Sequence, residues 1–174
     1  MKFTLTLANS LSLFRLIIAP VTVWNIISGW WLAASFLLIL AILSDLLDGP
    51  IARKKGQESS TGALIDHSCD AFLVAVLLFV LNITHEIPLL LPVLVILSFL
   101  QYVFDSKALT GQRLRTSFLG RFNGICYFVL VSLCIFTEAL EINIPDYTIL
   151  NFAWILITST LLSMSERLWT LVTK

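Results

Sequence analysis

The sequence has little charge and few cysteines. Only 13% of its 174 residues are Asp, Glu, Lys or Arg, about half of the roughly 25% found in an ordinary soluble domain. Eleven basic and eleven acidic residues cancel, so net charge does not point to a polyanionic partner such as a nucleic acid. Cys69, Cys126 and Cys134 are odd in number and lack metal-ligand spacing, which excludes a disulfide scaffold and indicates free thiols.

Apolar residues are in excess. They make up 58% of the chain, against roughly 45–50% in soluble domains. This composition excludes disorder and disfavours a soluble globular domain. The length allows about six spanning helices, because each needs about 20 residues. We therefore predict an all-α, polytopic integral membrane protein, with residues 1–174 forming a single domain.

The spacing of charges divides the chain into six predicted transmembrane helices. The uncharged run 16–44 would form one helix of about 43 Å, longer than a hydrocarbon core of about 30 Å. We therefore place a turn at Ser28-Gly29. The apolar run 71–84 is too short to span, so the third helix must begin earlier. The other predicted helices occupy about residues 9–27, 30–54, 87–104, 120–137 and 147–170.

The positive charges predict the orientation. All eleven Lys and Arg residues fall at the N-terminus, the 2–3 connection, the 4–5 connection or the C-terminus. With six helices, these four places lie on one side of the membrane. The opposite connections hold four acidic residues and no Lys or Arg. The positive-inside rule then predicts that both termini are cytoplasmic.

Four aspartates flank the connection between the second and third predicted helices. Asp45 and Asp48 are three residues apart, and Asp66 and Asp70 are four apart, so each pair shares a helical face. The short connection lets the two helices pack antiparallel, which would bring the four carboxylates together. Such a cluster repels itself unless cations offset it. Mg²⁺ or Mn²⁺ suits oxygen ligands at a site that also binds phosphates.

Two glycines and an arginine accompany the aspartates. Gly49 and Gly62 remove side chains where a ligand or a neighbouring backbone comes close. Arg53 lies about one turn beyond Asp48 and could clamp a pyrophosphate. A purely structural alternative pairs the carboxylates with Arg53 and the two lysines after it, but it does not account for the glycines.

The residues from Asp45 to Asp70 match every fixed position of the pattern D-x2-D-G-x2-A-R-x8-G-x3-D-x3-D. This run resembles the signature of the class I CDP-alcohol phosphatidyltransferases, integral membrane enzymes of phospholipid synthesis. The segment Asn9-Ser-Leu-Ser-Leu-Phe-Arg15 resembles the opening Asn-x-Leu-Thr-x-x-Arg of bacterial members, with Ser12 in place of the usual Thr. Length and this segment are similar to phosphatidylglycerophosphate synthases.

The resemblance implies an activity and a set of roles. The chain would transfer the phosphatidyl group from CDP-diacylglycerol to an alcohol hydroxyl and release CMP. Two divalent ions, Mg²⁺ or Mn²⁺, would be bound, and Asp70 would also act as general base. The metal ligands would be Asp45, Asp48, Asp66 and Asp70. The CDP moiety would be held by Asn9, Asp45, Gly49, Arg53 and Gly62.

The resemblance also implies a setting. Homodimers are common among enzymes of this kind. With the predicted orientation, the site would face the cytoplasm from a bacterial inner membrane.

The 4–5 connection is the best indication of the acceptor alcohol. Its cations fit an acceptor phosphate, as in glycerol 3-phosphate, with inositol phosphate or another polar alcohol as the alternative. They fit equally a flank attracted to anionic lipid headgroups. The candidate residues are Lys107, Arg113, Arg115 and Arg121.

Two further interpretations concern packing and function class. Gly120 and Gly124, four residues apart, indicate a helix-packing face. A small cation transporter would also place carboxylates at membrane depth. It would not account for Gly49, Arg53 and Gly62 at their spacing, or for the clustering of acidic residues on one side.

Overall fold

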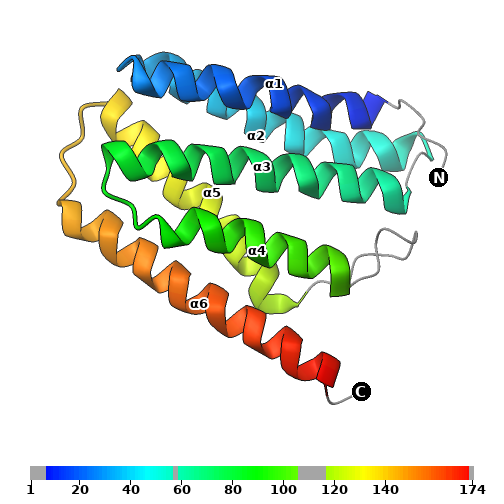
Figure 1. Ribbon diagram of the computed structural model, residues 1–174. Coiled ribbons are helices and arrows are strands. Elements are labelled where there is room, and N and C mark those ends of the chain that lie inside the picture. Colours follow the sequence, from blue (N-terminus) through cyan, green and yellow to red (C-terminus); the bar gives the residue numbers. More distant parts are fainter. Residues whose placement is uncertain (1–6, 57–58, 106–116, 173–174) are drawn as a thin grey trace.

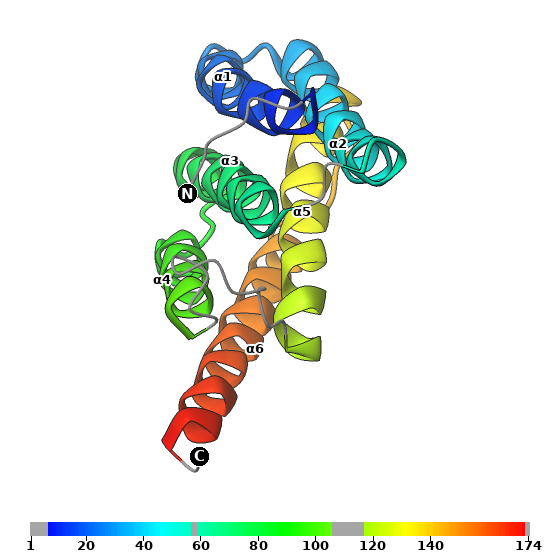
Figure 2. The ribbon, with the colours of Figure 1, turned by 90° about the vertical axis from the view of Figure 1, so that its right-hand side faces the viewer.

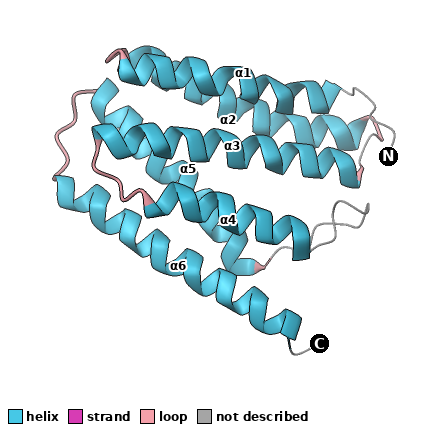
Figure 3. Ribbon diagram, viewed as in Figure 1, coloured by secondary structure: helices cyan, strands magenta, loops and turns pink. Residues whose placement is uncertain are grey.

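A computed structural model describes residues 7–56, 59–105 and 117–172. The described residues form helices joined by short connections and contain no strand (Figure 3). The helices are α1 (Leu7–Ile27), α2 (Trp31–Lys54), α3 (Ser60–Thr84), α4 (Leu90–Asp105), α5 (Phe118–Ala139) and α6 (Asp146–Val172). The predicted all-α fold and its helix boundaries are therefore confirmed to within a few residues.

Five of these helices are long and apolar enough to cross a membrane. The exception is α4, whose 16 residues span about 24 Å at 1.5 Å per residue, less than the roughly 30 Å of a hydrocarbon core. Pro92 lies in its first turn, where the missing N–H is tolerated.

The helix ends follow from local chemistry. The turn predicted after α1 is present, and Gly29 adopts a positive φ of 74°, a conformation that glycine reaches without strain. The hydroxyl of Ser59 caps α3 by accepting a hydrogen bond from the Gly62 N–H. Ser117 caps α5 in the same way through the Gly120 N–H, so both helices begin where a serine satisfies an otherwise unpaired donor.

The helices pack in two groups that share α3 and α5. Helices α1, α2 and α3 lie side by side, with α1 against both others (Figure 1). Turned by 90°, the chain shows α5 running past α2 and α3 toward α6, while α4 packs between α3 and α6 (Figure 2). The buried core comes from all six helices and includes Ala19, Leu38, Leu77, Leu130 and Leu156, together with two of the three free cysteines.

Successive helices run in opposite directions, so like ends gather. In Figure 1 the start of α1, the end of α2 and the start of α3 lie on the right, with the end of α4, the start of α5 and the end of α6. The described Lys and Arg residues belong to this half of the bundle: Arg15, Arg53, Lys54, Lys55, Arg121 and Arg167. Glu86, Glu138 and Glu141 belong to the opposite end. The tertiary fold therefore segregates charge as the sequence predicts.

Candidate active site

Helices α2 and α3 bring the four aspartates to two neighbouring levels, with Asp45 and Asp70 about one turn deeper than Asp48 and Asp66. Asp48 lies about 9 Å before the end of α2, and Asp66 about 9 Å after the start of α3, at 1.5 Å per residue. Because α2 and α3 both pack against α1, the carboxylates meet beside its middle turns. We call Asp45, Asp48, Asp66 and Asp70 the acidic cluster.

Arg15 of α1 ion-pairs with every member of the acidic cluster. Its Nη1 lies 2.5 Å from Asp45 Oδ1 and 2.8 Å from Asp70 Oδ1. Its Nη2 lies 2.8 Å from Asp48 Oδ2 and also pairs with Asp66. The Arg15 side chain is completely buried, and that of Asp48 is 7% exposed. A buried guanidinium needs such partners, because transferring an unpaired charge out of water is very unfavourable.

Ser12 supports the same arrangement from one turn earlier on α1. Its buried hydroxyl lies 3.2 Å from Asp48 Oδ2 and 3.1 Å from Asp66 Oδ1. This hydroxyl and the Arg15 guanidinium lie on one face of α1 because they are three residues apart. The first half of α1 is thus a structural part of the site, although the sequence interpretation assigned no role to Ser12 or Arg15.

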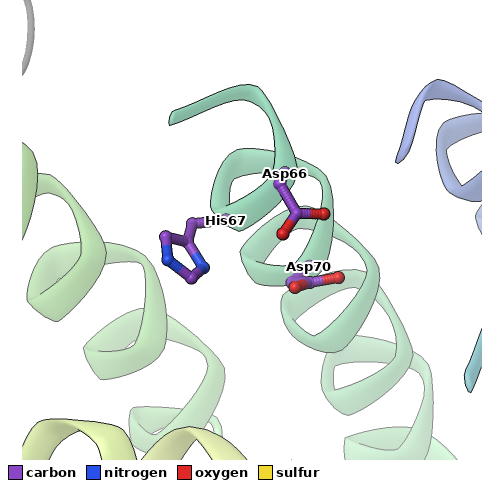
Figure 4. A group of neighbouring side chains, drawn as sticks. All are labelled: Asp66, His67 and Asp70. Carbon is purple, nitrogen blue, oxygen red and sulfur yellow. The ribbon is translucent and has the colours of Figure 1, made fainter. Parts of the chain in front are cut away.

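Asp66 and Asp70 point to the same side of α3, as Figure 4 shows. His67 extends from another face of the helix toward α4, where its ring meets Tyr102 edge-on at 6.1 Å between centroids. A ring nitrogen of His67 still lies within 4.8 Å of oxygens of both carboxylates.

The acidic cluster fits a metal ion by its chemistry. One oxygen each from Asp45, Asp48 and Asp66 lie within 4.8 Å of one another, and carboxylate oxygens are the ligands that hard divalent cations take. Arg15 supplies one positive charge against four carboxylates, so it neutralises only part of their charge and a further cation would be attracted. The residues present are therefore suited to hold a divalent ion.

The remaining motif residues lie nearer the helix ends. The guanidinium of Arg53 folds back over Gly49, where a Cβ would lie 3.6 Å from Nη1, an ordinary van der Waals contact. Gly62 lies in the first turn of α3, and its N–H is held by Ser59. Asn9 is in the first turn of α1, with a side chain outside the described part of the structure.

A cavity of about 500 Å³ adjoins the acidic cluster. Asp45 and Asp70 line it together with Arg121, at the start of α5, and Arg167, near the end of α6. His67 and Tyr102 contribute polar groups, and α5 supplies much of the remaining lining. We call this the cationic cavity. It places candidate proton-accepting carboxylates and two guanidinium groups around a single space.

Arg167 is the member of this cavity that sequence reasoning missed. Its guanidinium stacks over the Tyr102 ring, with Cζ 5.1 Å from the centroid, and its Nε and Nη2 each lie 3.4 Å from Ser117 Oγ. Its Nη1 and the Tyr102 hydroxyl are buried and make no hydrogen bond within the described part of the chain. In the sequence, Arg167 counted only as one of the basic residues that predict the orientation, and nothing in its spacing linked it to α5.

The predicted packing face at Gly120 and Gly124 is not formed within the described chain. At Gly120, a Cβ would collide with the Arg167 guanidinium and would lie 2.9 Å from Ser117 Oγ. At Gly124, a Cβ would meet no atom within 4 Å. The close approach at Gly120 is to side chains and not to a neighbouring helix backbone, so the two glycines do not act together as a packing face here.

A second hollow begins at Asp45 and follows α5 between α2 and the α5–α6 connection. Its volume is about 630 Å³, and its lining is almost entirely apolar, from Ile125 and Val129 through Phe136 to Ile144. We call this the apolar groove. Because Asp45 lines both hollows, the groove and the cationic cavity meet at the acidic cluster. The other predicted acceptor residues, Lys107, Arg113 and Arg115, lie outside the described residues.

Comparison with known proteins gives local matches to named enzymes. The chain is 40% identical over 70 residues to a chloroplastic CDP-diacylglycerol–glycerol-3-phosphate 3-phosphatidyltransferase of Oryza sativa, covering 40% of this chain and 21% of that protein. It is 37% identical over 92 residues to the human cardiolipin synthase (CMP-forming), covering 52% and 31%. The corresponding enzyme of Streptomyces coelicolor is 35% identical over 94 residues, covering 49% and 42%.

The chain thus spans between 21% and 42% of the length of these curated relatives. The model of the CDP-alcohol phosphatidyltransferase family, in contrast, matches residues 5–165. That match includes α1 with Arg15, the whole acidic cluster and the start of α5 with Arg121. With nearly the entire chain matched, this protein belongs to the CDP-alcohol phosphatidyltransferase family.

Proposed function

We propose that this protein transfers the phosphatidyl group of CDP-diacylglycerol to the hydroxyl of an alcohol and releases CMP. The observation that carries the proposal is the shared lining of the cationic cavity, in which Asp45 and Asp70 face the same space as Arg121 and Arg167. A carboxylate can accept a proton there while the guanidinium groups hold an anion.

The reaction needs one bond to form and one to break. The acceptor oxygen attacks the phosphorus that carries the diacylglycerol, and the bond from that phosphorus to the bridging oxygen breaks. CMP leaves with the bridging oxygen, and the acceptor's hydroxyl proton goes to Asp70. The Asp70 side chain is 21% exposed and lines the cavity, so a hydroxyl there can reach it.

The acidic cluster would hold two divalent ions, Mg²⁺ or Mn²⁺, with Asp45, Asp48, Asp66 and Asp70 as ligands. Such ions polarise the pyrophosphate and offset the charge of the leaving CMP. Arg53, folded over Gly49 at the end of α2, and Asp45 would hold the CDP moiety, with Asn9 and Gly62 nearby. These assignments rest on the match to the motif and on the meeting of the four carboxylates around Arg15.

The apolar groove would take an acyl chain of the lipid donor. It starts at Asp45 and continues past Val129 and Phe136, so a lipid whose headgroup reaches the acidic cluster could extend along it. A run of α5 from Ile125 to Thr137 measures about 18 Å, close to the roughly 15 Å depth of one leaflet's hydrocarbon.

Glycerol 3-phosphate is the acceptor that the cationic cavity fits best. Arg121 and Arg167 would bind its phosphate, and its hydroxyl would lie toward Asp70. The similarity to cardiolipin synthases supports a second candidate, phosphatidylglycerol, whose phosphodiester offers the same charge beside a glycerol hydroxyl. The site would face the cytoplasm, since the described Lys and Arg residues share its end of the bundle.

An acceptor panel tests this proposal. Purified protein in nanodiscs receives CDP-diacylglycerol, Mg²⁺ or Mn²⁺, and one acceptor at a time, and CMP release is measured. We expect release with glycerol 3-phosphate and little with glycerol or serine. Release with phosphatidylglycerol in preference would assign the second candidate. Absence of CMP with every acceptor would contradict the enzymatic proposal and favour the transporter alternative.

A further inference from the structure

Arg15 has an unusual environment for a basic side chain in an apolar helix. It is completely buried, and its terminal nitrogens pair with all four carboxylates of the acidic cluster. Its Nε is also buried and makes no hydrogen bond to any residue that the structure describes. Among the described residues, the guanidinium is therefore held through the carboxylates that are suited to bind a metal ion.

One guanidinium and one or more divalent ions would use the same ligands. Asp45, Asp48 and Asp66 can direct one oxygen each to a common point, yet each of them already pairs with Arg15. Two cations drawn to the same oxygens repel each other. Binding of a metal ion should therefore oppose the Arg15 contacts, and the Arg15 contacts should oppose binding of a metal ion.

Removing Arg15 would also affect the protein that holds no metal. Taking away one partner of a buried charge cluster leaves the others uncompensated and is strongly destabilising. Asp48, with 7% of its side chain exposed, would lose its ion pair with Arg15 and keep the contact with the Ser12 hydroxyl. The same substitution thus has two opposite consequences, depending on whether a divalent ion is present.

We propose that Arg15 is a positioning residue that acts as a built-in counter-cation: it holds the four carboxylates together in the metal-free protein and competes with divalent ions for them. This inference rests on the metal-binding part of the proposed function. It does not require that the acceptor or the reaction be correct.

The test measures Mn²⁺ affinity and thermal unfolding without donor or acceptor. Chelator-treated protein in detergent is titrated with Mn²⁺, with free ion followed by electron paramagnetic resonance. We expect Arg15→Gln to bind Mn²⁺ at least about tenfold more tightly than the unaltered protein. We expect its metal-free unfolding temperature to fall by about 5 °C or more, and saturating Mn²⁺ to recover most of that loss.

Two variants sharpen the comparison. Arg15→Lys keeps the charge and should bind Mn²⁺ within about threefold of the unaltered protein. Lys54→Gln removes the same charge from an exposed position at the end of α2 and should change neither quantity. If Arg15→Gln folds only with Mn²⁺, it is purified with the ion, and slower Mn²⁺ loss to a chelator than from Arg15→Lys is the supporting result.

An equal or weaker Mn²⁺ affinity in Arg15→Gln would overturn the proposal, as would an effect of the same size in Lys54→Gln. These outcomes leave the transferase proposal standing, because CMP release is measured separately. Conversely, tighter Mn²⁺ binding by Arg15→Gln in a protein that releases no CMP would support the role of Arg15 and contradict the proposed function.

Discussion

The guanidinium of Arg167 occupies the space beside Gly120 that a Cβ would fill in any other residue. This contact joins α6 to α5 and fixes Arg167 against Ser117 Oγ, 3.4 Å away. Together with stacking on Tyr102, it holds a cation at the wall of the cationic cavity. Replacing Gly120 with alanine would therefore displace the Arg167 guanidinium without moving the backbone of α5.

Gly120→Ala is expected to raise the KM for glycerol 3-phosphate about tenfold, because the new methyl group displaces Arg167 from the cavity. The long arginine side chain can move aside, but Ser117 Oγ, which caps α5 and would lie 2.9 Å from the new Cβ, must also shift, so stability should fall by about 1 kcal/mol. Gly124→Ala is the comparison variant: it adds a methyl group to the wall of the same cavity but meets no atom within 4 Å, so Arg167 stays in place and KM should change much less. Equal effects of both substitutions in steady-state assays would contradict this account.

Arg167→Gln and Arg121→Gln should each raise the KM for a phosphorylated acceptor by about 10–100-fold, since each removes a charge-assisted hydrogen bond to phosphate. The KM for CDP-diacylglycerol should change less than about threefold, because neither residue lines the apolar groove. The check is a full set of initial rates with each substrate varied in turn. A larger change for the lipid donor would assign these residues to the nucleotide.

Asp70→Asn should lower kcat by about 10²–10⁴-fold, the usual contribution of a general base, because an amide cannot accept the hydroxyl proton. Binding of CDP-diacylglycerol, followed by equilibrium titration in nanodiscs, should persist. Glu141→Gln makes the same chemical change at the opposite end of the bundle and should behave like the unaltered protein. Near-normal turnover by Asp70→Asn would exclude Asp70 as the base.

Val129→Trp should impair use of long-chain CDP-diacylglycerol, because the indole would fill part of the apolar groove. We expect its KM to rise about tenfold, while a donor with six-carbon chains should be affected far less. Ile155→Trp places the same side chain on an exposed position of α6, outside the groove, and serves as control. If both chain lengths suffer equally, the acyl chain does not lie in this groove.

Much of the fold could be predicted from composition and charge spacing. Gly29 ends α1, and Ser59 and Ser117 begin α3 and α5, for local reasons. A long apolar run predicts a membrane helix without reference to any other segment. The shared face of Asp66 and Asp70 was likewise predictable, because residues four apart in a helix must align. The inclusion of these aspartates in α3 followed from helix length alone.

The partners of those aspartates were not predictable from spacing. Arg15 is 30 residues from Asp45 and 51 from Asp66, and within its own helix it resembled a charge marking a membrane boundary. Arg167 and Gly120 lie on different helices, so no local pattern relates them. Contacts of this kind depend on how α1 seats against α2 and α3, and on how α6 crosses α5.

The sequence by itself determined six helices, the end of the bundle that carries the basic residues, and a motif of aspartates and glycines at one helix junction. Hydrophobicity and helical periodicity act over a few turns, so a short stretch of sequence is enough to predict each helix. The tertiary structure decided which cation meets those aspartates, and which arginines share a cavity with them. These contacts depend on packing between helices far apart in sequence, because a buried charge is stable only when an oppositely charged group lies beside it.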